Sequence, residues 1–174
     1  TGRGDCDRVF AALRPLDQVN RVLPQVAVDS VVAGAPGTVQ VCVSARSVAG
    51  TVGTATRASG LHDLRLFRDG RMVAGRGAAP ASLDPDDRAA WARQTAIADQ
   101  TCPDAAATFT VAVPQGAARD VTFTAYAFNT DRVKGDTSPP VTYRVPVAAT
   151  PRQPRAYVIA IGVNDYPKLP EKSL

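Results

Sequence analysis

The sequence has few of the residues that build metal centres and catalytic dyads. Its 174 residues include one histidine, His62, and three cysteines with no Cys-x-x-Cys pair. A zinc site of the usual kind needs three or four clustered His, Cys or acidic ligands. No Gly-x-Gly-x-x-Gly stretch follows Gly162, so the phosphate cradle of a dinucleotide fold is missing as well. We therefore expect no metal site and no cofactor.

Long apolar runs and blocks of like charge are also missing. The longest apolar run, residues 156–163, has eight residues, whereas a membrane-spanning helix needs about 20. The net charge of +4 is spread along the chain, with 16 basic and 14 acidic residues in positions 1–150. Basic patches interleaved with aromatic residues, which are typical of nucleic-acid binding, do not occur. The sequence predicts neither a membrane span nor a nucleic-acid partner.

Short segments of alternating apolar and polar residues are frequent and predict a mainly β chain. Asp69-Gly70 lies between two such segments, as in a two-residue hairpin turn. Seven short strands with turn signals and no long helix between them indicate an antiparallel immunoglobulin-like or fibronectin-like β-sandwich over residues 25–149. The segments are 26–28, 39–43, 64–68, 71–73, 108–113, 120–129 and 141–147.

Two helical segments are expected beside the strands. Apolar residues spaced by three and four predict a short helix over about 16–23, within a helical lead-in of residues 1–24. A second helix over 88–98 is predicted inside an insertion of residues 75–106. The acidic residues before it, Asp84, Asp86 and Asp87, are expected to cap that helix, because the spacing and closing Glu of a calcium loop are absent.

The odd number of cysteines leaves the disulfide pattern open. Cys42 lies on the face of its strand opposite the valines, so we expect it to be exposed. It could pair with Cys102 or with Cys6, or all three thiols could be free. An immunoglobulin-type bridge between sheets is not expected, because the partner strand carries Tyr126 and Phe128 and no cysteine.

Other candidate residues have ordinary structural interpretations. His62 lies in a Ser-Gly-Leu-His-Asp stretch without a Ser or Cys at a recognisable spacing, so we expect an ordinary turn residue. The tripeptide at residues 3–5, Arg-Gly-Asp, is interpreted as chance. Trp91, Tyr126 and Tyr143 are the aromatic candidates for an exposed ligand-binding face, although core packing is the expected role of Tyr126.

The pattern changes after the proline-rich linker at residues 146–154. Residues 156–163 are continuously apolar, which is typical of a central parallel strand covered on both faces. Ligands of open α/β sheets bind beyond the carboxyl ends of strands. Asn164, Asp165 and Tyr166 follow this strand and are therefore candidates for the margin of an active site, or else they form a loop that merely exits the strand.

Residues 155–170, Arg-Ala-Tyr-Val-Ile-Ala-Ile-Gly-Val-Asn-Asp-Tyr-Pro-Lys-Leu-Pro, resemble the opening strand and loop of bacterial caspase-like cysteine peptidases of the caspase and metacaspase family. Residues 64–73 and 123–134 are similar to strands of the immunoglobulin-like module that precedes the peptidase in such proteins, and residues 14–23 to the helix that leads into that module. The resemblance implies that residues 150–174 are the linker and start of a caspase-like domain.

It also implies a bacterial parent protein that cleaves peptide bonds with a Cys thiolate and a His base. The family's His-Gly and Asp-x-Cys stretches lie downstream of the opening strand and do not occur here, so no catalytic residue can be assigned and this chain alone should be inactive. We interpret the chain as a fragment or a processed product. Its expected partners are the remainder of the peptidase domain and a protein partner or substrate. The alternative is a non-enzymatic adhesion or ligand-binding module.

Overall fold

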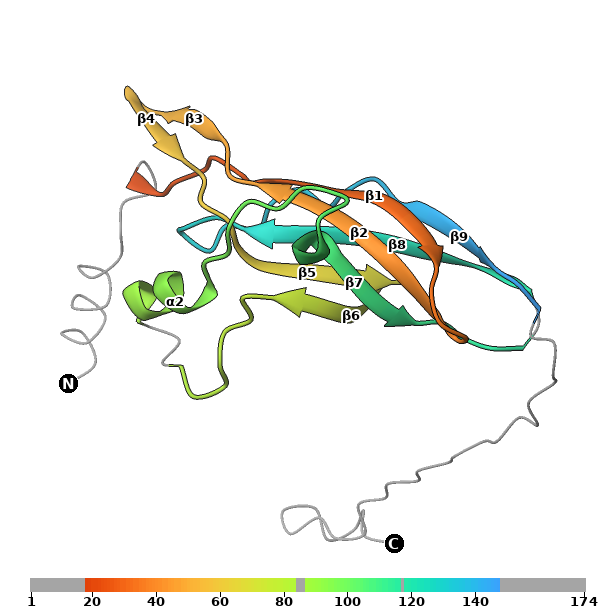
Figure 1. Cartoon of the computed structure of the whole chain (residues 1–174). Coiled ribbons are helices and arrows are strands. Elements are labelled where there is room, and N and C mark those ends of the chain that lie inside the picture. The colour runs from red at the N-terminus through yellow and green to blue at the C-terminus, as the bar shows by residue number, and fades with distance from the viewer. Residues whose placement is uncertain (1–17, 84–86, 117, 148–174) are drawn as a thin grey trace, which may run out of the picture.

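The computed structural model describes residues 18–83, 87–116 and 118–147, and this part of the chain is mainly β (Figure 1). Besides the strands it contains the helix α2, Arg88–Thr95, and the 3-10 turn η2, Ala105–Ala107. The strands are β1 (Gln25–Ala33), β2 (Thr38–Arg46), β3 (Ala49–Val52), β4 (Ala55–Ala58), β5 (His62–Arg68), β6 (Arg71–Arg76), β7 (Thr108–Ala112), β8 (Arg119–Phe128) and β9 (Val141–Val145).

Every strand pairing in the described residues is antiparallel. One sheet has the order β1-β2-β7, a second has the order β6-β5-β8-β9, and β3 and β4 form a separate hairpin. Figure 1 shows the three-stranded and four-stranded sheets facing each other along most of their length. The prediction of a mainly β chain with antiparallel sheets is therefore confirmed.

The alternating residues of the two sheets form one hydrophobic core. Val39, Val41 and Val43 of β2 are fully buried, as are Leu64 and Leu66 of β5. They belong to the same cluster as the inward residues of β8: Val121, Phe123, Ala125 and Ala127. Because side chains of a strand point alternately to opposite faces, these buried residues are directed at the other sheet and their neighbours along each strand outward.

The predicted Asp-Gly turn joins β5 to β6. Asp69 has φ of 50° and Gly70 has φ of 78°, the left-handed conformation that both central residues of a type I′ turn require. The Asp69 carboxylate accepts a hydrogen bond from the backbone N–H of Thr122 at 2.9 Å, which ties the turn to β8. The hairpin was therefore correctly predicted from the residue pair alone.

The N-terminal helix predicted over residues 16–23 is wrong for residues 19–23, whereas Gln18 has a 3-10 conformation and residues 16 and 17 lie outside the described residues. Residues 19–24 are not helical, because their backbone groups have partners elsewhere in the fold. The side-chain amide of Asn129 donates to the carbonyl oxygens of Asn20 and Val22 at 2.5 and 3.0 Å, and the backbone N–H of Asn20 donates to Asp131 at 2.7 Å. Tertiary hydrogen bonds override the helical spacing of the apolar residues.

The β3–β4 hairpin was not predicted. Its eight residues are exposed or half-buried, and it extends beyond the end of the two sheets (Figure 1). The segment is rich in Gly, Ala and Thr and has no alternating large apolar residues. The period-two signal that identifies a half-buried strand is therefore absent from it.

The predicted helix of the insertion is confirmed but shorter, since α2 ends at Thr95. Asp87 caps it as expected, and its carboxylate accepts from the backbone N–H of Ala90 at 2.8 Å. Asp84 and Asp86 lie outside the described residues, as do Cys6, the Arg-Gly-Asp tripeptide and residues 148–174 with Asn164, Asp165 and Tyr166. None of the helices described is long and apolar enough to cross a membrane.

Candidate functional site

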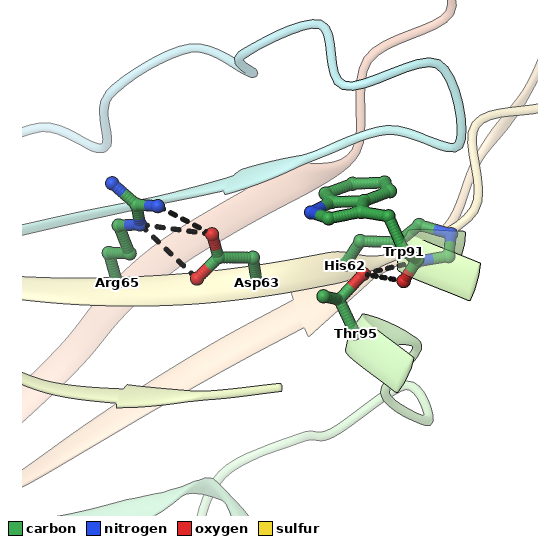
Figure 2. Close-up of polar contacts among 5 residues, drawn as sticks. All are labelled: His62, Asp63, Arg65, Trp91 and Thr95. Atoms are coloured by element: carbon green, nitrogen blue, oxygen red, sulfur yellow. Dashed lines mark hydrogen bonds and ion pairs between the residues drawn. The ribbon is translucent and has the colours of Figure 1, made fainter. Parts of the chain in front are cut away.

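The single histidine and the single tryptophan of the sequence lie together where α2 packs against the start of β5 (Figure 2). His62 is only 6% exposed and begins β5, so the prediction of a turn residue was wrong. Its ring stacks on Trp91 with centroids 5.1 Å apart, and Nδ1 lies 3.3 Å from the Thr95 hydroxyl. That hydroxyl donates to the Trp91 carbonyl oxygen at 2.8 Å.

These contacts give His62 a structural role. Because the Thr95 hydroxyl donates to Trp91, its oxygen is left to accept the Nδ1–H of a neutral imidazole. Burial lowers the pKa of His62 from its ordinary value of 6.5, so the ring is neutral at pH 7. Both partners are residues of α2, and neither is a thiol. His62 therefore holds α2 against the sheet in the described part of the chain and is not paired with a catalytic thiol.

A pH dependence of stability follows from this burial. The unfolded chain protonates His62 at a higher pH than the folded protein does, so the free energy of unfolding should fall as the pH drops below about 6.5. We expect urea denaturation to reveal a larger loss between pH 7.5 and 5.5 in the wild type than in His62→Gln, whose amide can still meet Thr95. Equal losses in the two proteins would contradict the assignment.

A second group of residues covers the outer side of the four-stranded sheet, and we name it the aromatic–cation face: Arg65, Phe67, Tyr126, Phe128 and Lys134. Phe67 stacks on Tyr126 with centroids 5.1 Å apart, and Tyr126 meets Phe128 edge to face at 5.6 Å. The Arg65 guanidinium lies 5.0 Å above Phe128, and the Lys134 ammonium lies 4.3 Å from the Tyr126 ring. Lys134 is exposed and the other four residues are half-buried, so the face is accessible to solvent.

Arg65 is held in position by Asp63. The guanidinium makes three hydrogen bonds of 2.6 to 3.2 Å to the Asp63 carboxylate, which is almost fully buried (Figure 2). The hydrogen bond with Asp63 raises the pKa of Arg65 above its ordinary value. The arrangement therefore presents fixed aromatic rings with cations over them. Chemically it can stack on a flat or apolar group and donate hydrogen bonds to an acceptor beside it.

Cys42 and Cys102 form a disulfide in the structure. The expectation of an exposed Cys42 was wrong, since this residue is 6% exposed. The end of the insertion lies over its strand: Gln100 and Ala45 exchange two backbone hydrogen bonds of 2.9 Å, and the backbone N–H of Cys102 donates to Ser44 at 3.1 Å. The bond therefore ties the insertion to β2, and it does not bridge the two facing sheets.

The structure separates the three aromatic candidates of the sequence. Trp91 is buried under Arg132, whose guanidinium lies 5.0 Å above its ring, and Tyr143 packs against the core. Only Tyr126 lies on the outer side of a sheet. The sequence reasoning missed Phe67, although alternation with Leu64 and Leu66 places it on the outward side of β5. Lys134 could not be found in this way, because it lies in a loop.

Comparisons with known proteins add little to this geometry. No protein-family model matches the chain, and no curated protein matches it. A search of solved structures gives a family 28 exopolygalacturonase from Yersinia enterocolitica, with 13% sequence identity and a TM-score of 0.35. The match covers 72% of this chain, which spans about 20% of the length of that enzyme. A similarity at this TM-score carries no argument about fold or function.

Proposed function

We propose that this chain is the non-catalytic accessory portion of a caspase-like cysteine endopeptidase, an immunoglobulin-like β-sandwich followed by the first strand of the peptidase domain. The observation that carries the proposal is the motif of residues 155–166, an apolar strand followed by Gly-Val-Asn-Asp-Tyr directly after a proline-rich linker. The two facing sheets support it, because the buried core residues that the structure describes all lie between Val28 and Val145, before the linker begins.

The reaction belongs to residues outside this chain. In a peptidase of this type, a Cys thiolate attacks the peptide carbonyl carbon and a His base transfers the proton to the leaving amine. Within the described residues, the two cysteines are joined to each other and the histidine is packed between Trp91 and Thr95. The proposed role of the β module is to orient the peptidase, to bind its partner or substrate, or to restrain its activity.

The test is to extend the coding sequence beyond Leu174 and assay the full-length product on peptide substrates. We expect a His-Gly and an Asp-x-Cys stretch downstream, and a loss of hydrolysis of at least about a thousandfold when that cysteine is replaced by alanine. Deleting residues 1–150 should change the basal rate if the module regulates the enzyme, whereas an unchanged rate would make it a passive spacer. Absence of both stretches would overturn the peptidase proposal.

A ligand-binding or adhesion module is the second candidate, and the aromatic–cation face is the observation that favours it. Aromatic and Arg side chains are the types that dominate binding interfaces. Glycans and proteins would be screened for binding to the isolated module, with Tyr126→Ala as the disruptive variant. Thr142→Ala, an exposed change on the neighbouring strand β9, is the control. Binding that survives Tyr126→Ala would exclude this face as its site.

A further inference from the structure

A groove opens at the end of the two sheets where the chain leaves toward residue 148, and we name it the exit groove. It encloses about 760 Å³. Its walls come from three places: the β1–β2 turn at residues 33–38, the end of β7 with Val113 and Gln115, and the end of β9 with residues 145–147. Figure 1 places these three segments together at the end of the molecule opposite α2.

The exit groove carries no charge. None of its thirteen lining residues is charged, although 21% of the chain is. Three large hydrophobic side chains are strongly exposed in the described residues, and one of them, Val147, lines the groove and is 67% exposed. An uncharged concave surface with an exposed apolar side chain on its wall is a candidate interaction site.

The opposite end of the molecule differs in chemistry. A second pocket of about 530 Å³ lies there, between the start of β1 and the loop at residues 136–139. Its lining includes Arg46 and Asp136, together with the polar side chains of Gln100 and Ser44. The absence of charge is therefore a property of the exit end and not of pockets in this fold generally.

We propose that the exit groove is the docking surface for the segment of this chain that follows the linker, residues 155–174, as part of the domain that this segment opens. The inference rests on the proposed function for the existence of that domain. We identify the occupant from the connectivity of the chain, because the linker to this segment starts at the groove. Val147 is both a wall of the groove and the eighth residue before Arg155.

The linker limits the distance between the groove and that segment. Residues 146–154 include three prolines, and a proline-rich linker spans about 3.1 Å per residue, so its reach from Val147 to residue 155 is about 25 Å. A tether of this length gives the segment an effective concentration at the groove on the order of millimolar. Because no charged side chain lines the groove, covering it with a tethered domain requires no ion to lose its water.

Hydrogen exchange in the full-length gene product tests the proposal. Exchange of the turn at residues 33–38 would be compared with that in a chain ending at Val147, which keeps every buried residue of the core cluster in the described part of the chain. We expect exchange at least about tenfold slower in the full-length product. The variant Ala35→Asp should remove this protection, since it places a charge on an exposed wall residue. Ala79→Asp, an equally exposed loop alanine outside the groove, should leave the protection intact.

Each other outcome would overturn the proposal. Equal exchange in the two chains would mean that the groove is open to solvent, and protection that grows with protein concentration would identify a second copy as the occupant. Loss of protection in both variants would deny that the groove is responsible. Peptide hydrolysis is measured separately, so an active peptidase with an unprotected groove would overturn docking alone. A protected groove in a product without the His-Gly and Asp-x-Cys stretches would overturn the proposed function alone.

Discussion

Replacing Cys42 and Cys102 together by alanine is expected to lower the free energy of unfolding by about 4 kcal/mol. The disulfide closes a loop with a sequence separation of 60 residues. In the chain-entropy account, a cross-link of that length removes about 14 cal/mol/K from the unfolded ensemble, or about 4 kcal/mol at 25 °C. Urea denaturation followed by circular dichroism measures the change. This loss is a large part of the 5 to 15 kcal/mol that typically stabilises a domain.

The loss of stability is expected to include the insertion that carries α2. The disulfide ties the end of the insertion to β2, and α2 with Trp91 lies in the same insertion. Trp91 is the protein's only tryptophan, so its fluorescence reports on α2 directly. The wild type treated with a reductant is the matched comparison and should unfold at the same urea concentration as the double variant. A reduced wild type as stable as the oxidised one would contradict the expectation.

Phe123→Ala is expected to cost about 3 to 5 kcal/mol and to lower Tm by roughly 10 to 15 °C. Phe123 is completely buried and is the largest fully buried side chain among the residues that the structure describes. Truncation to alanine loses the transfer free energy of the ring and leaves a cavity between the sheets, which cannot close fully around it. Calorimetry or thermal denaturation measures the shift.

Phe67→Ala is the matched control, because it is the same substitution on the neighbouring strand of the same sheet. Phe67 pairs with Thr124 on the outward side of the sheet and is half-buried against Tyr126. Its truncation leaves a gap that solvent can fill, so we expect a cost of about 1 to 2 kcal/mol. A Phe67→Ala cost equal to that of Phe123→Ala would mean that the outer face of this sheet is covered in solution.

The strands were predictable because their evidence is local. In β2 and β8, buried residues alternate with outward residues, and this period of two can be read without knowing any partner. The Asp69-Gly70 turn and the Asp87 cap were equally local, since each depends on the conformational preferences of one or two residues. The β3–β4 hairpin was missed for the same reason, because its small residues give no periodic signal.

The candidate site was less predictable because its residues come from separate segments. Trp91 reaches His62 only when α2 folds back on β5, and Lys134 reaches Tyr126 from a loop after β8. The local pattern around His62 indicated a turn, whereas its burial is produced by a helix that follows 26 residues later. No spacing rule relates such residues, since the fold alone determines their distance.

The sequence by itself determined that this protein is mainly β, where most of its strands and its hairpin turn lie, and that a proline-rich linker precedes a segment of different pattern. Only the tertiary structure decided which cysteines pair, that residues 19–24 are not helical, and which aromatic side chains face outward. The physical reason is the range of the interactions. Alternation and turn preferences act between neighbours along the chain, whereas Asn129, Cys102 and Trp91 act on residues brought to them by the packing of the whole module.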